Sequence, residues 1–206
     1  MRVLLKTFLV GALAFYIGWL MGWYFEGHKH ELPSVRQEVK NITSVPEPIK
    51  PEVKHILKAN PEISEAEAVE IFNTIEQVVE SFHADPCYRG GVAEKVNARL
   101  VLSLIITESN CRKRTRGSSG EIGLTQVMPF HVKSLHRAGI LSEPNIAQLW
   151  DIGRNIRSGV YILMMQAVRS KTIKEALAKY NAGPKRVKAG MPYALRVMRQ
   201  YSRIDG

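Results

Sequence analysis

The 206-residue sequence has no stretch of useful length in which apolar and polar residues alternate, and it has no visible internal repeat. Because alternation is the pattern of a half-buried strand, its absence argues against a sheet as the framework of the fold. Apolar residues make up 45% of the chain, as in a globular protein. We therefore predict an all-α protein, with at most a small irregular or β element in the Gly-rich loop of residues 110–123.

Residue patterns that would bind a metal or a phosphate are also missing. The six histidines show no metal-ligand spacing, since even His131 and His136 are five residues apart and would not share a helix face. Gly117, Gly120 and Gly123 follow no strand and precede no Gly-Lys-Ser/Thr, which argues against a phosphate-binding loop. The sequence also gives no support for a catalytic Ser/His/Asp arrangement. We expect neither a metal nor a cofactor.

The formal charge of +10 is unevenly distributed. Residues 1–85 hold 8 Lys or Arg against 12 Asp or Glu, whereas residues 86–206 hold 21 against 7. A strongly basic region favours an anionic partner such as a nucleic acid, an acidic membrane surface or an acidic polymer, although it can also serve solubility alone. The sequence has no recognition-helix pattern, zinc finger or aromatic RNA-binding signature, so we expect no nucleic acid partner.

The N-terminal segment predicts a membrane anchor. Nineteen residues from Thr7 to Phe25 carry no charge, and as a helix they nearly span a bilayer core. Arg2 and Lys6 precede this run and no Ala-x-Ala-like site follows it, which favours an uncleaved anchor over a cleaved signal peptide. We assign residues 1–26 as one transmembrane helix, with the N-terminus in the cytoplasm and the rest of the chain across the membrane.

Residues 27–62 have the composition of a flexible tether. Charges alternate there without apolar periodicity, and prolines interrupt any helix at Pro33, Pro46, Pro48, Pro51 and Pro61. Residues 63–206 are predicted to form the folded helical domain. Its first helix starts at the capping box Ser64–Glu67, and apolar residues then recur at helical spacing as far as Phe82.

A second helix, from about residue 92 to 108, should lie at the centre of the domain, because its run 100–106 is apolar on all sides. Further helices are expected near 124–138, 144–168, 172–181 and 191–203. Pro192 suits the first turn of the last of these helices.

The sequence leaves the state of its two cysteines open. In an exported domain Cys87 and Cys111 would be able to form one disulfide. As free thiols they would be ordinary small core residues.

Glu108 is a candidate general acid because of its position. It ends the apolar helix just before the Gly-rich loop, where desolvation would raise the pKa of its carboxyl toward neutral pH. A glutamate at a helix end is more often an ordinary surface charge, so the position alone does not establish catalysis.

Four short motifs follow one another along the chain. They are Glu108-Ser109, GEIGLTQVMP at residues 120–129, NIRSG at 155–159 and ALAKYNAGP at 176–184, followed by Tyr193, Val197 and Tyr201. Over about residues 86–203 this set resembles the soluble lytic transglycosylase family, which is related to goose-type lysozyme. The resemblance implies a lysozyme-like all-α fold and cleavage of the bond between N-acetylmuramic acid and N-acetylglucosamine.

The resemblance also implies a role for each matched residue. Glu108 matches the single catalytic acid/base, and Gln126 matches a residue lining the substrate cleft near the muramic acid acetamido group. Tyr180 matches a tyrosine whose hydroxyl approaches the catalytic carboxyl, and Asn181 borders the cleft. The glycines match backbone positions where a side chain would crowd the sugar or the turn: Gly120, Gly123 and Gly183.

Purely structural roles remain alternatives for these polar residues. Gln126 would then only bridge backbone groups, while Tyr180 and Asn181 would only pack and cap a helix end. Glu121 stands where the family often has a small apolar residue. We expect it to be a surface charge, although its loop is able to fold back over the cleft.

The implied activity is that of a peptidoglycan lytic transglycosylase, which uses one carboxyl twice and leaves 1,6-anhydro-N-acetylmuramic acid ends. The alternatives are a muramidase of the same fold and a wall-binding assembly component of a secretion, pilus or phage machine. The expected partners are peptidoglycan glycan strands and, through the N-terminal helix, the bacterial inner membrane. The catalytic domain is then expected in the periplasm, where cell-envelope or secretion machinery is a further candidate partner.

Overall fold

The computed structural model describes residues 48–205, and within them the regular elements are helical. The seven α-helices are α2 (Pro51–Ala59), α3 (Glu65–Ala84), α4 (Ala98–Ser109), α5 (Val132–Arg137), α6 (Ile152–Ala167), α7 (Ile173–Ala182) and α8 (Val187–Asp205). Short 3-10 turns lie at Pro86–Tyr88, Ala93–Lys95, Pro129–His131 and Ile146–Trp150. The all-α prediction is confirmed.

The predicted anchor at residues 1–26 lies outside the described residues. Among residues 48–205, none of the helices has both the length and the apolar content needed to cross a bilayer.

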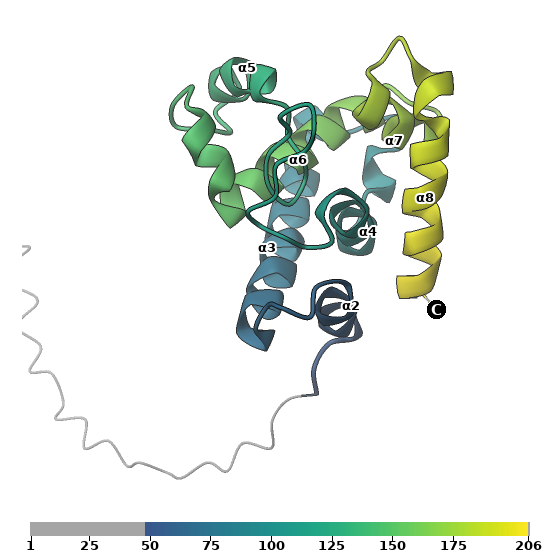
Figure 1. Ribbon diagram of the computed structural model, residues 1–206. Coiled ribbons are helices and arrows are strands. Elements are labelled where there is room, and N and C mark those ends of the chain that lie inside the picture. The colour runs from purple at the N-terminus through teal and green to yellow at the C-terminus, as the bar shows by residue number, and fades with distance from the viewer. Residues whose placement is uncertain (1–47, 206) are drawn as a thin grey trace, which may run out of the picture. The chain divides into compact units, whose positions relative to one another are not determined.

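Helix α4 lies at the centre of the fold, as its uniformly apolar run predicts. All residues from 100 to 106 are buried. Figure 1 shows α4 nearly end-on, between α3 and α8 and above α2. Asn97 caps its first turn by accepting a hydrogen bond from the Leu100 amide (2.9 Å), and Asn110 ends it in the left-handed conformation with φ 49°. The last turn, which carries Glu108, is therefore held by packed neighbours.

Helix α2 lies within residues 27–62, where we expected a tether. Val53 and Ile56 are fully buried, and the Glu52 carboxylate binds Arg99 of α4 (2.8 Å). Pro51 stands in the first turn of α2, where a helix needs no hydrogen-bond donor, so it starts the helix instead of interrupting it. The tether prediction is therefore wrong for residues 51–59.

A tight loop and the short α5 replace the helix expected near 124–138. Ile122 and Val127 pair through two backbone hydrogen bonds of 3.0 Å each. Gly123 and Gln126 have φ values of 75° and 50°, which no right-handed helix contains. The buried Leu124 is three residues from Val127, so the apolar spacing is helical although the backbone is not.

Helices α6 and α8 also begin at other residues than the sequence predicted, for local reasons. The Asp151 carboxylate accepts a hydrogen bond from the Arg154 amide (2.8 Å) and starts α6, which divides the helix expected at 144–168. Helix α8 begins four residues before the expected position and encloses Pro192. Gly190 permits this start, because a side chain there would overlap the Ala178 carbonyl of α7.

Both cysteines are free thiols, with Cys87 exposed and Cys111 fully buried. Burial raises the pKa of the Cys111 thiol to about 12, so it stays protonated at neutral pH. The Cys111 carbonyl accepts a hydrogen bond from the Asn60 side chain (3.3 Å), which ties the loop after α4 to the end of α2. Cys111 therefore has the place of a core residue.

Candidate active site

A cleft of about 750 Å³ opens beside the C-terminal end of α4. Its walls come from the last turn of α4, the loop of residues 117–131, α6, and the stretch from the end of α7 to residue 186. Five of the seven residues to which the sequence analysis gave a site role lie in its lining: Glu108, Gln126, Tyr180, Asn181 and Gly183. Three of the four motifs thus contribute residues to one cavity, whereas the motif at 155–159 does not line it.

Glu108 accepts a short hydrogen bond in surroundings that disfavour its charge. The Tyr193 hydroxyl donates to Glu108 Oε1 over 2.7 Å. The pKa of Glu108 is raised to about 7, chiefly by desolvation; the Tyr193 hydrogen bond lowers it, the Glu121 charge raises it and Arg196 lowers it. A carboxyl with this pKa can give a proton at neutral pH and take one back.

Tyr193 is a site residue that our sequence reasoning missed. It lies on α8, 85 positions from Glu108, and only 3% of its surface is exposed. The motif set included Tyr193 without a role, because its helical spacing from Val197 is equally typical of a core aromatic. The available signal was chemical: a buried tyrosine hydroxyl needs a partner, and Glu108 was the carboxylate without one.

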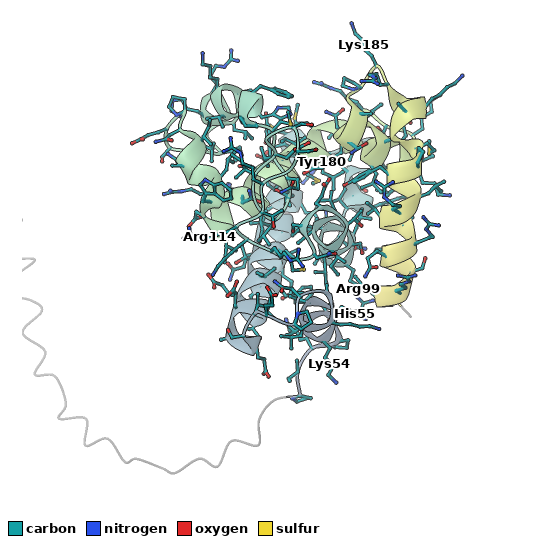
Figure 2. All side chains as sticks on the ribbon, in the orientation of Figure 1. Lys54, His55, Arg99, Arg114, Tyr180 and Lys185 are labelled. Carbon is teal, nitrogen blue, oxygen red and sulfur yellow. The ribbon has the colours of Figure 1, made fainter. Side chains whose placement is uncertain are left out.

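The Tyr180 hydroxyl bonds to the backbone and not to the Glu108 carboxyl. It donates to the Thr125 carbonyl over 2.6 Å, which joins α7 to the loop above α4. Tyr180 is half-buried and lines the cleft; Figure 2 labels it among the side chains of the upper half of the domain. Desolvation and the charge of nearby Glu108 raise the Tyr180 pKa well above its ordinary value, so the hydroxyl remains a proton donor.

Gln126 lies in the cleft with its amide nitrogen already bound. Nε2 donates to the carbonyls of Gly123 (2.8 Å) and Thr115 (3.3 Å), as the backbone-bridging alternative predicted. Its amide oxygen has no donor among the described residues, and it lies beside Gly117, where an added Cβ would approach it to 2.6 Å. The oxygen is therefore free to accept a hydrogen bond from a ligand.

Buried Asn155 of α6 fixes the conformation of this loop. Its Nδ2 donates to the carbonyls of Ile122 (2.9 Å) and Leu149 (2.8 Å). Its Oδ1 accepts from the amide (2.9 Å) and the hydroxyl (2.8 Å) of Thr125. A Cβ at Gly123 would lie 2.3 Å from Asn155 Nδ2, so only glycine fits there. Gly123 is not in the cleft lining, and its contribution is to the loop.

Glu121 has the folded-back position that the sequence left open. It lines the cleft with Glu108, and its Oε2 accepts a hydrogen bond from the Ser119 amide (3.0 Å). The cleft therefore contains a second carboxylate, whose charge raises the Glu108 pKa.

Residues 88–194, just over half of the chain, match the transglycosylase SLT domain. This chain belongs to the transglycosylase SLT domain family. The fold is also similar to that of an inactive mutant of the lytic transglycosylase Slt from Pseudomonas aeruginosa, with a TM-score of 0.54 and 19% identity. The similarity covers 64% of this chain and 23% of that protein, so the chain matches about a quarter of its structural relative.

The SLT domain match contains both members of the Glu108–Tyr193 pair and every predicted cleft residue. Helices α2 and α3 precede the match, and most of α8 follows it, although all three pack on α4. Within residues 48–205 no group of three or more His, Cys, Asp or Glu side chains is placed to hold a metal ion.

Proposed function

We propose that this SLT-domain protein is a peptidoglycan lytic transglycosylase in which Glu108 is the catalytic acid and base. The observation that carries the proposal is a partly desolvated carboxyl of pKa about 7, bound by Tyr193, in a cleft of about 750 Å³. In the Pseudomonas aeruginosa relative, a glutamate-to-glutamine change accompanies an inactive protein, which supports a chemistry that depends on one glutamate.

In the first step, protonated Glu108 gives its proton to the glycosidic oxygen between N-acetylmuramic acid and N-acetylglucosamine. The bond to the anomeric carbon breaks, and the leaving sugar departs with a hydroxyl group. The positive charge that develops at the anomeric carbon is stabilised by the acetamido group of the substrate, as in other glycosidases that use substrate assistance. The free amide oxygen of Gln126 is suited to orient the N–H of that acetamido group.

In the second step, ionised Glu108 removes the proton from the 6-hydroxyl of the same muramic acid. The hydroxyl oxygen bonds to the anomeric carbon and closes a 1,6-anhydro ring, which returns Glu108 to its protonated form. Attack within one sugar gains from proximity and needs no bound water. Tyr193 supports both states of the carboxyl, because its hydroxyl bond holds Glu108 Oε1 in place while the proton comes and goes.

A muramidase is the second candidate, and Glu121 is the observation that favours it. Hydrolysis usually requires a second carboxylate that activates water or acts as the nucleophile. Glu121 lines the same cleft and its charge reaches Glu108. The hydrogen bond from the Ser119 amide, however, occupies one Glu121 oxygen and holds the side chain within its own loop.

Digestion of purified peptidoglycan, followed by mass spectrometry of the released muropeptides, tests the proposal. We expect products ending in 1,6-anhydro-N-acetylmuramic acid, lighter by one water than hydrolytic products. Reducing-end N-acetylmuramic acid as the main product would favour the muramidase, and no cleavage at all would favour a wall-binding component.

We also propose that residues 1–26 anchor the protein in the bacterial inner membrane, with the catalytic domain in the periplasm. The uncharged run and its preceding Arg2 and Lys6 support this topology. A reporter enzyme that is active only outside the cytoplasm, fused after residue 206, should be active. Activity of a cytoplasmic reporter in its place would reverse the topology.

A further inference from the structure

A second concave surface lies on the side of α4 that faces α2 and α8. It consists of two adjoining hollows of about 510 and 350 Å³, which share Ile106, Asn110, Gln200 and Arg203 in their linings. Figure 2 shows His55 on α2 near the C-terminal end of α8, where the larger hollow opens. The charged side chains that line this surface, here called the basic groove, are His55, Lys58, Arg196, Arg199 and Arg203.

The cations of the basic groove have no acidic neighbour among the described residues that line it, although Arg196 acts on Glu108, which lies outside that lining. No acidic side chain among the described residues lines either hollow. Lys58, Arg199 and Arg203 are exposed and have no hydrogen-bond or ion-pair partner within the described part of the chain. Arg196, Arg199 and Arg203 are three and four residues apart, so they lie along one face of α8. Like charges held this closely repel one another, and an anionic ligand relieves that repulsion.

The basic groove starts next to the catalytic pair. The Arg196 guanidinium lies over the Tyr193 ring, 5.7 Å from its centroid, and its charge acts on Glu108. Thr107, the neighbour of Glu108, also lines the groove. A ligand that occupies the groove can therefore belong to the same polymer that Glu108 cuts.

The dimensions of the groove fit a short peptide. From Arg196 to Arg203 the axis of α8 advances by about 10 Å, at 1.5 Å per residue. An extended peptide of three to five residues spans about 10–17 Å. The peptide stems of peptidoglycan begin at muramic acid and carry free carboxylates, which arginine binds through paired N–H···O bonds.

Two other anionic partners fit less well. Membrane-surface helices insert large apolar side chains, and the exposed ones within residues 48–205, Phe130, Ile146 and Leu195, do not line the groove. Single-stranded nucleic acids stack their bases on aromatic rings, and no Phe, Tyr or Trp side chain lines either hollow in the described residues.

We propose that the basic groove binds the carboxylates of peptidoglycan peptide stems and so retains peptide-bearing strands while the cleft acts on their glycan. The proposal rests on the proposed function, since it takes the glycan strand to be the substrate. It makes the enzyme selective for strands that still carry stems over strands from which an amidase has removed them.

The test compares R199E/R203E with the control R137E/R154E in the full-length chain. Both variants reverse two exposed arginines, but Arg137 and Arg154 line neither the cleft nor the groove. Binding to intact sacculi and to amidase-stripped glycan is measured by sedimentation in a Glu108→Gln background, so that binding is separated from cutting. Cleavage of both substrates is measured with variants in which Glu108 is unchanged.

We expect R199E/R203E to bind intact sacculi about tenfold or more weakly, and stripped glycan within about twofold of the parent protein. The milder R199Q/R203Q should show the same selectivity with a smaller loss, which protects the result if charge reversal impairs folding. The control should match the parent on both substrates.

Three outcomes would overturn the proposal. Equal losses on intact and stripped strands would make the groove a glycan site, and no loss on either would remove it from wall binding. Lost binding to phosphatidylglycerol vesicles or to single-stranded DNA, with sacculus binding intact, would assign the groove to that other polyanion. Groove-dependent sacculus binding without any cleavage would instead contradict the proposed function and leave the groove assignment in place.

Discussion

Glu108 lines the cleft and its neighbour Thr107 lines the basic groove, but the polar groups of the two regions are held differently. In the cleft Glu108, Tyr180 and Gln126 each have a protein partner at hydrogen-bond distance. In the groove the arginines extend from α8, and no carboxylate among the described residues shares the lining with them. Fixed groups suit a reaction, because catalysis requires positions set before the substrate arrives. Unpaired, exposed cations suit attraction of an anion, because they need little geometry and act over a distance.

The largest effect should come from Glu108→Gln, which removes the titrating proton and leaves the shape of the cleft. We expect turnover of peptidoglycan to fall by about 10²–10⁴-fold, as for the loss of a general acid. Sedimentation with intact sacculi should show unchanged binding, because the groove does not depend on the carboxyl. Digestion of peptidoglycan by Glu108→Gln at the parent rate would show that Glu108 is not catalytic. The functional difference between the cleft and the groove would then have no support.

Substitutions in the residues that support the cleft should lower the free energy of unfolding more than substitutions in the groove. Asn155→Ala removes the hydrogen-bond partner of the buried Leu149 carbonyl and of the Thr125 amide, while the Ile122 carbonyl keeps the Val127 amide. We expect a loss of about 2–4 kcal/mol in the free energy of unfolding, measured in urea. In the groove, R199Q/R203Q should change it by less than about 0.5 kcal/mol, since exposed groups without partners contribute little.

Asn145→Ala is the matched control for Asn155→Ala. Asn145 is exposed and accepts one hydrogen bond, from the Ala147 amide (2.9 Å), at the start of a 3-10 turn. Its loss should cost about 1 kcal/mol, as for a helix cap. Equal effects of the two alanine variants would show that burial of the Asn155 network adds nothing to stability.

Features encoded by neighbouring residues were predictable from the sequence, and features that join distant segments were not. The burial of α4 and the raised pKa of Glu108 follow from the run of apolar residues that precedes it. The Glu108–Tyr193 bond joins positions 85 residues apart, and no local pattern distinguishes Tyr193 from a packing residue. For Tyr180 the resemblance gave proximity to the carboxyl, and the charge of Glu108 does act on Tyr180, but it did not give the hydrogen bond of the hydroxyl to the Thr125 carbonyl.

The backbone conformation of the loop that contains Gln126 could not be predicted from the sequence, for a different reason. Leu124 and Val127 have helical spacing, but Gln126 has a positive φ. The loop around it is held by the bond of Thr125 to Asn155 and by the bonds of the Gln126 side chain to Thr115 and Gly123, which form only in the folded protein. Helix α2 was missed because proline was taken as a helix breaker, whereas Pro51 occupies the first turn.

Tyr193→Phe should have an intermediate effect on catalysis. The Tyr193 hydrogen bond lowers the Glu108 pKa, so its removal should raise that pKa further above about 7. General acid activity is lost as the carboxyl ionises, and the alkaline limb of the pH–rate profile should therefore move to higher pH. We expect turnover at neutral pH to fall about tenfold, because Oε1 loses the bond that positions it.

Tyr201→Phe is the control on the same helix, since its hydroxyl accepts a hydrogen bond from Asn97 (3.0 Å) and lines neither region. Its pH–rate profile should coincide with that of the parent protein. A Tyr193→Phe profile that also coincides would mean that the 2.7 Å bond does not set the acidity of Glu108.

The smallest effect is expected from Glu121→Gln, and it decides between one carboxylate and two. The Glu121 charge raises the Glu108 pKa, so neutralising it should lower that pKa and move the alkaline limb of the pH–rate profile to lower pH, by less than about one unit. Glu143→Gln, an exposed change outside the cleft, should move nothing. In the transglycosylase mechanism Glu121 touches no reacting atom, so the anhydro product should persist in Glu121→Gln. If Glu121 instead activates water, the parent protein should release reducing-end products. Glu121→Gln should then lose turnover or release a different product. The product of this variant therefore shows whether Glu121 is only an electrostatic neighbour of Glu108 or a second catalytic group. The pH shift alone does not distinguish these roles, because both place a negative charge near Glu108.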